Sequence, residues 1–131
     1  MKSLHLDVEV TIDSICNLLC SALEGGSNYW YELESIKEPV RYDYRTDPEQ
    51  LFLHLDSPLN FGGHLKIRSL EDDIINGKSS WELNLYTIKK GLGVMASKYP
   101  SHFADLINEN TDAITGDVFL QCCLFGEIIY S

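Results

Sequence analysis

The pattern of hydrophobic and polar residues divides the chain into short alternating segments and longer helical stripes. Leu4 to Val10 alternates strictly, with apolar side chains at even positions and polar ones at odd positions, which is typical of a half-buried strand. Residues 11–24 carry apolar side chains at helical spacing, namely Ile12, Ile15, Cys16, Leu19 and Leu23. We therefore expect an N-terminal strand followed at once by an amphipathic helix.

Capping chemistry marks both ends of this first helix. Thr11 or Asp13 can cap its start, and Gly25 can close it in the left-handed conformation that glycine adopts without strain. Gly26, Ser27 and Asn28 follow as a short loop of turn residues. An aromatic triplet, Tyr29 to Tyr31, leaves that loop directly and starts a segment that reads as extended up to Ile36.

The second half of the chain predicts further helices. One runs from about 87 to 99, where Gly91 and Gly93 indicate close packing against a neighbour. A short amphipathic piece covers 101–109, after Pro100. The last helix, about 112–125, has Thr111 or Asp112 as its cap and closes at Gly126. It is apolar on most of its surface, so we expect it to be the most buried helix, with a short extended tail at 127–131.

Four other segments complete the predicted elements. Residues 64–71 and 80–85 read as two strands of a hairpin that turns at Asn76 and Gly77. Val40 to Thr46 alternates and predicts another strand, and 49–56 predicts a short helix that starts at Asp47 and Pro48.

These elements predict an α+β fold in one domain, 1–131. A small antiparallel sheet, made of the N-terminal strand, the aromatic segment and the hairpin 64–85, packs against two long helices, about 11–24 and 112–125, plus a third, about 87–99. A chain of 131 residues with 44% hydrophobic side chains suits one core of this size.

Charge and segment composition limit the classes of partner. The formal net charge of −10, from 20 acidic and 10 basic residues, argues against binding in a DNA groove, which needs clustered Lys and Arg. An acidic surface can dock on a basic protein, but the carboxylates are spread along the chain, and ordinary solubility explains most of the charge. No apolar run approaches the roughly 20 residues that span a bilayer, and the N-terminus lacks a signal region. We expect a cytoplasmic protein that does not enter membranes.

The four cysteines predict buried thiols and no metal site. Cys16 and Cys20 are four residues apart on a helix, and they would need a second pair opposite to bind a metal ion. Cys122 and Cys123 point about 100° apart, so they cannot easily supply that pair. We interpret all four as small core residues of a protein in a reducing compartment.

The first candidate binding segment runs from Gly25 to Tyr31. The backbone amides of Gly25, Gly26, Ser27 and Asn28 can face a ligand, and Tyr29 or Trp30 can stack on a planar group. The competing interpretation is structural, because Trp30 can plug the core where helix meets sheet. The pattern alone leaves both interpretations open.

A second candidate segment lies a few residues further on. In an extended 40–46 segment Arg41 and Arg45 share one side with Asp43, and Tyr42 and Tyr44 take the other. Arg41, Tyr44 and Arg45 can contact an anion or a nucleotide, with arginine on phosphate and tyrosine on a base. The structural alternative is a solvated strand in which Asp43 pairs with its own arginines.

No catalytic motif stands out in the sequence. The GxxxxGK, HExxH, GxSxG and CxxC patterns are all missing. His64, which follows Gly62 and Gly63 at a strand start, is the histidine to test as a general base, although no nucleophile is visible beside it. Asp72 and Asp73 can hold a hard cation, but a solvated turn explains them more simply. The sequence favours a protein without catalytic residues, metal or cofactor.

Two longer stretches carry a resemblance. ALEGGSNYWY near the start and DVFLQCCLFGEIIY at the end resemble a group of small proteins encoded by bacteriophages and other mobile elements. No activity or site residue of that group can be transferred to this chain. The resemblance implies a viral accessory protein in the host cytoplasm, and such proteins often counter host defence.

The leading expectation is therefore non-catalytic binding that counters host defence, by sequestering a small nucleotide immune signal. The alternatives are an acidic inhibitor that binds a host defence effector directly, a small hydrolase of a nucleotide signal, and a structural subunit of a phage particle. A homo-oligomer is compatible with each of these.

Overall fold

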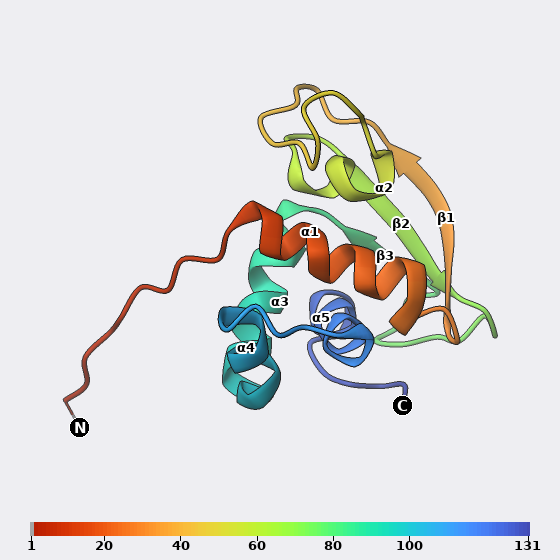
Figure 1. The fold of residues 1–131 in the computed structure, drawn as a ribbon. Helices are drawn as coiled ribbons and strands as arrows, with labels where there is room; N and C mark the ends of the chain where they lie inside the picture. The colour runs from red at the N-terminus through yellow and green to blue at the C-terminus, as the bar shows by residue number, and fades with distance from the viewer. Residues whose placement is uncertain (1) are drawn as a thin grey trace.

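Helix α5 (Ala113–Phe125) is the most buried α-helix of the computed structural model, which describes residues 2–131 (Figure 1). Ten of its 13 residues are buried, as expected from its largely apolar sequence. Asp112 caps its start by accepting a hydrogen bond from the Thr115 amide at 2.9 Å. Gly126 closes it with a φ of 75°, and both predicted ends are confirmed.

Helix α1 (Ile12–Ser21) packs against α5 and begins as predicted, because the Thr11 side chain accepts from the Ser14 amide at 3.1 Å. The predicted left-handed stop at Gly25 is wrong. The helix continues into one wide π-helical turn, η1 (Ala22–Gly26), and ends at Ser27. This turn brings Gly26 so close to the start of α5 that a β-carbon there would overlap the Ala113 carbonyl.

The sheet has three antiparallel strands in the order β1 (Tyr31–Lys37), β2 (His64–Ser69) and β3 (Ser80–Leu83). In its register Leu33 lies opposite Ile67, and Ile67 lies opposite Trp81, with an irregularity of β1 after Leu33. The buried apolar residues of β2 and β3 belong to the same core as α1, α5 and a further helix, α3 (Leu85–Lys98). The predicted α+β class and the predicted hairpin are confirmed.

The turn between β2 and β3 also follows its sequence. Asn76 and Gly77 have φ values of 54° and 77°, and Ile75 and Lys78 pair on either side of them. Two consecutive left-handed residues define the tight hairpin turn that an Asn-Gly dipeptide favours. The turn sits at the tip of a longer connection between the two strands, residues 70–79.

Helices α3 (Leu85–Lys98) and α4 (Pro100–Ile107) close the other side of α5 (Figure 1). The predicted close approach is confirmed for Gly91, which packs against Cys123 of α5. It is wrong for Gly93, where a β-carbon would have no neighbour within 4 Å. The tail at 127–131 is bound to α5 by Gln121, whose Oε1 accepts from the amides of Ile129 and Tyr130.

The predicted N-terminal strand is wrong. Residues 2–10 form an extended arm that projects from the body and pairs with no other described segment (Figure 1). Leu4 is 92% exposed and Leu6 is 84% exposed. The predicted burial of one face is wrong as well, since Leu4, Leu6 and Val8 are all exposed. A strand needs a hydrogen-bonding partner besides an alternating pattern, and the described residues supply none here.

Two further predictions between β1 and β2 are wrong. Residues 40–46 bend and form no strand, because buried side chains take the backbone hydrogen bonds that a ladder would use. The predicted helix at 49–56 shrinks to α2 (Leu53–Asp56), which continues as a 3₁₀ turn, η2 (Ser57–Leu59). Asp47 does not start it, and instead closes a separate turn with Gln50.

None of the helices in residues 2–131 combines the length and apolar character that crossing a membrane requires.

Candidate ligand-binding site

Asp117 of α5 organises the segment from Gly25 to Tyr31. Its Oδ1 accepts hydrogen bonds from Ser27 Oγ and Trp30 Nε1, and its Oδ2 accepts one from Tyr29 Oη, each at 2.7 Å. A carboxylate in the middle of an apolar helix is costly unless donors surround it. Three donors from one short segment meet that requirement, so this segment is fixed against α5.

Trp30 is the centre of an aromatic cluster. Its side chain is 3% exposed and stacks on Tyr130, with ring centroids 4.9 Å apart and planes 9° from parallel. Phe125 and Tyr31 contact the same indole at tilted and edge-on angles. This placement matches the structural interpretation of Trp30, and the indole face is not available to stack on a ligand.

The rest of that segment divides between core and surface. Ser27 is buried, Gly25 and Asn28 are exposed, and Tyr29 is 51% exposed although its hydroxyl is bound to Asp117. Gly26 and Tyr29 line a mostly apolar groove of about 640 Å³ beside α5 and the tail. Tyr130 lines the groove as well, and Asp117 and His102 are the acidic and imidazole side chains in its lining.

The segment with Arg41, Tyr44 and Arg45 is held by two buried polar side chains. Asp56 is fully buried, and it accepts from the amides of Thr46 at 2.8 Å and Phe52 at 2.9 Å. Asn60 binds Tyr44 on both sides, accepting from its amide at 2.7 Å and donating to its carbonyl at 2.8 Å. These bonds satisfy the backbone groups of an irregular loop with buried side chains, and a satisfied network of this kind makes the loop rigid.

The neighbouring loop approaches this segment through two glycines. The Val40 amide donates to the Phe61 carbonyl at 2.8 Å. Gly62 has a φ of 82°, and a β-carbon there would lie 2.9 Å from Val40 Cγ2. A β-carbon on Gly63 would overlap the Ser57 carbonyl. Glycine is therefore required at both positions for the two loops to meet.

The two loops, the end of β1 and the starts of β2 and α3 enclose a hollow of about 510 Å³ that we call the basic–aromatic hollow. Its volume lies in the range of small-molecule pockets. Three exposed aromatic side chains line it, namely Tyr44, Phe61 and Tyr86. The charged or titratable side chains in its lining are Lys37, Arg41 and His64, together with the carboxylates of Asp43 and Glu82.

Arg41 links the charged and aromatic parts of the hollow. Its Nε donates to Asp43 at 2.8 Å, and its guanidinium carbon lies 5.0 Å from the centre of the Phe61 ring. A guanidinium has five N–H donors, so one bond to Asp43 leaves capacity for an anionic group. Tyr86 is 73% exposed at the start of α3 and offers a free ring face. This combination can bind a planar, negatively charged molecule.

His64 and Glu82 form the other polar wall of the hollow. His64 Nδ1 lies 2.7 Å from Glu82 Oε1, across the neighbouring strands β2 and β3. Lys37 is the register partner of His64 on the other side, in β1. The carboxylate orients the imidazole ring, which is the arrangement that a general base requires.

The structure places the two candidate segments that the sequence predicted at different hollows. Arg41 and Tyr44 line the basic–aromatic hollow, whereas Gly26 and Tyr29 line the groove beside α5. Arg45 lines neither of these two hollows. Its guanidinium carbon lies 5.0 Å from the centre of the Tyr42 ring instead. Ligand binding by any of these residues stays a prediction.

Sequence reasoning missed the partners that complete each site. Phe61 and Tyr86 come from a glycine-rich loop and a helix start, far from Arg41 in sequence. For Phe61 the sequence offered one indication, because this aromatic residue lies inside an Asn-Phe-Gly-Gly loop and belongs to no apolar stripe of a helix or strand. For Asp117 the signal was a single carboxylate within an otherwise apolar helix.

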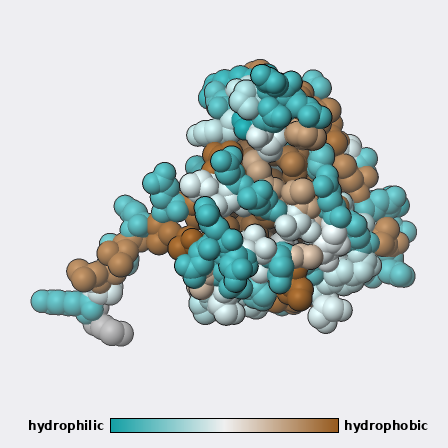
Figure 2. Space-filling view, in the orientation of Figure 1, coloured by the Kyte–Doolittle hydropathy of each residue, from teal (hydrophilic) through white to brown (hydrophobic). Residues whose placement is uncertain are grey.

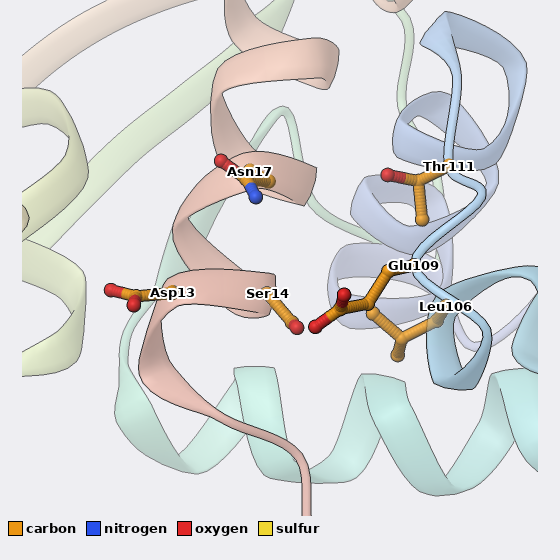
Figure 3. A pocket seen from close by; sticks show the side chains of 6 residues that line it. All are labelled: Asp13, Ser14, Asn17, Leu106, Glu109 and Thr111. Atoms are coloured by element: carbon orange, nitrogen blue, oxygen red, sulfur yellow. The ribbon is translucent and has the colours of Figure 1, made fainter.

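A third hollow, of about 270 Å³, is polar and lies between α1 and the connection that follows α4 (Figure 3). Ser14 and Glu109 point toward one another across it, whereas Asp13 points away on the other side of α1 (Figure 3). Without a cation in its lining it suits water better than an anionic ligand.

The cysteines are all unpaired thiols in the structure. Cys16, Cys122 and Cys123 are buried, and Cys20 is partly exposed. Burial raises the pKa of Cys16 to about 12 and that of Cys122 to about 11. Among residues 2–131, no group of three or more His, Cys, Asp or Glu side chains has the arrangement of a metal site.

Comparison with known proteins adds no functional information, because no family model, no curated protein and no solved structure matches this chain.

Proposed function

We propose that this protein acts by non-catalytic binding, holding a small planar anion of the nucleotide type in the basic–aromatic hollow. The observation that carries the proposal is the meeting of Arg41, Phe61 and Tyr86 around one hollow of about 510 Å³. Arginine binds phosphate through several parallel N–H donors, and bases stack on exposed aromatic faces.

The loop anchors support binding without large rearrangement. Asn60 and Asp56 already fix the backbone at Tyr44 and Thr46, and the bond from the Val40 amide to the Phe61 carbonyl fixes the residue before Arg41. A ligand therefore does not have to order that loop, and less of its interaction energy is lost on binding. The resemblance to small phage proteins supports the biological role, in which the protein counters host defence by sequestering a nucleotide immune signal.

The first test is mass spectrometry of molecules released by heat from protein purified out of defence-active cells. A stoichiometric nucleotide released intact supports the proposal. A protein that is empty, and that instead co-purifies with a host polypeptide, contradicts it and favours an acidic inhibitor that binds a defence effector directly.

The second test is calorimetric titration with a cyclic dinucleotide as the probe. Arg41→Ala removes a charged hydrogen-bond donor, so we expect affinity to fall about tenfold or more. The matched control is Arg68→Ala, since Arg68 pairs with Glu32 on the sheet and lies outside the hollow. Equal loss in both variants, or no loss in either, contradicts binding at the hollow.

One observation favours a second candidate, hydrolysis of such a nucleotide. The pair of His64 and Glu82 places a carboxylate-oriented imidazole in the wall of the same hollow. Hydrolysis predicts a cleaved product that accumulates with time and disappears with His64→Gln. Binding alone predicts that the released molecule is unchanged, so the two candidates give different mass spectra.

A further inference from the structure

The N-terminal arm exposes one apolar face. Leu4, Leu6 and Val8 are 92%, 84% and 58% exposed, although they alternate with polar residues as in a strand that packs on a core. Figure 2 shows hydrophobic atoms along the projecting arm, interleaved with hydrophilic ones. An exposed extended segment of this kind also offers unpaired backbone groups to another chain.

The same apolar face borders a groove in the body. Leu6, Val8 and Val10 form one side of a hollow of about 530 Å³. Its other sides come from α1, α3 and α4 and are mostly apolar, and they include Ile12, Ile15, Ile88, Leu92, Ala96 and Phe103. The arm is thus a wall of the groove, and a strand paired with the arm would place side chains over it.

The arm is complementary to itself in one antiparallel register. If Leu6 lies opposite Leu6 of a second copy, His5 faces Asp7, Ser3 faces Glu9, and Leu4 faces Val8. A shift by two residues in one direction places Asp7 opposite Asp7, and like charges directly opposite one another destabilise a strand pair. A shift in the other direction places His5 opposite His5 and Asp7 opposite Ser3, so the His5–Asp7 pair is lost. The first register is therefore preferred.

The two edges of the sheet fit an added strand less well. β1 exposes Glu32 and Glu34 at one edge, and β3 exposes Glu82 at the other. An arm that paired there would bring Asp7 and Glu9 beside those carboxylates. Pairing between the arms of two copies avoids that repulsion. A two-fold axis between the copies then forms each contact of the arms twice.

We infer that the arm is a dimerisation element, which pairs antiparallel with the arm of a second copy about a two-fold axis at Leu6. Each arm extends the other into a two-stranded ribbon, and Leu4 of one copy comes beside Val8 at the groove of the other. This inference is independent of the proposed nucleotide binding, because the groove and the basic–aromatic hollow share only Tyr44 and Leu85.

Sedimentation equilibrium of the full chain tests the inference. We expect a dimer, and we expect Leu6→Asp to raise its dissociation constant about tenfold or more. The variant keeps its fold, because Leu6 is exposed within a single copy. The matched control is Ile74→Asp, which changes a residue 75% exposed in the 70–79 connection and should leave association unchanged.

A charge exchange tests the register. His5→Asp places like charges opposite one another and should weaken the dimer, and adding Asp7→Lys should restore it. A wild-type chain that stays monomeric at about 100 µM overturns the inference. So does a dimer that Leu6→Asp leaves intact, since its contact then lies elsewhere. A double variant as weak as His5→Asp overturns the proposed register.

Discussion

The indole nitrogen of Trp30 donates a hydrogen bond to the carboxylate of Asp117 at 2.7 Å, and this bond joins the turn between η1 and β1 to the last helix. Ser27 and Tyr29 donate to the same carboxylate. The three bonds explain why a charged residue is tolerated on the most buried helix of the molecule. They also make Asp117 a polar residue on which the packing of the 27–30 turn against α5 depends.

Asp117→Ala should lower the free energy of unfolding by roughly 2–5 kcal/mol, because buried donors lose their acceptor. Asp117→Asn keeps one acceptor oxygen and should cost less. Urea denaturation followed by tryptophan fluorescence measures both. The control is Asp72→Asn, at an exposed side chain with a left-handed backbone that asparagine tolerates. A loss at Asp117 no larger than that of the control would refute the central role.

Gly91 and Gly93 form a matched pair in α3 with opposite expected effects. A β-carbon at Gly91 would overlap Cys123, so Gly91→Ala should destabilise the protein by about 1–3 kcal/mol. Gly93 has open space, and Gly93→Ala should stabilise it by up to about 1 kcal/mol through helix propensity. Thermal unfolding of the two variants measures the difference. Shifts of the same sign would contradict the packing of α3 on α5.

The raised pKa of Tyr29 predicts that the folded state loses stability at high pH. Burial of its hydroxyl, with the hydrogen bond and charge of Asp117, raises its pKa to about 12. Tyrosine in the unfolded chain ionises near pH 10, so the unfolded state loses its proton first and the folded state loses stability between about pH 10 and pH 12. Urea midpoints across this range should fall less steeply in Tyr29→Phe. An unchanged slope in that variant would contradict the contribution of Tyr29.

Cys20 should be the first thiol to react with an added reagent, and Glu24 should slow that reaction. The Cys20 Sγ donates a hydrogen bond to Glu24 Oε2 at 3.0 Å, and this bond is the main cause of the raised pKa of Cys20. Glu24→Gln should therefore speed its reaction with a chromogenic disulfide reagent, since the thiolate is the reactive form. Glu34→Gln, on β1, is the control. Cys20→Ser should abolish the fast phase, and a fast phase that persists would assign it to another cysteine.

Local chemistry made much of the fold predictable. Thr11, Asp112 and Gly126 mark helix ends, and Asn76 with Gly77 marks the hairpin turn, because each acts on backbone groups within a few residues. Segments that depend on distant partners were not predictable in this way. The arm has the pattern of a strand without a neighbour, and residues 40–46 bend because Asp56 and Asn60 take their backbone bonds.

The candidate site shows the same division. Arg41 and Tyr44 were identifiable as a basic and aromatic pair, even though the strand that suggested them does not form. Phe61, His64 and Tyr86 join them only through the approach of three separate segments. No periodicity within one segment encodes that approach. The burial of Trp30 likewise depends on Asp117, which lies 87 residues away.

That separation has a consequence for how the protein emerges during synthesis. A ribosome adds roughly 5–20 residues per second, so the 87 residues between Trp30 and Asp117 take roughly 4–17 s to appear. During that interval the indole and the apolar stripe of α1 have no final partner and stay open to chaperones or to a neighbouring nascent chain. Synonymous codon changes that slow translation before residue 117 would lengthen this vulnerable period and should lower the soluble yield without altering the finished molecule.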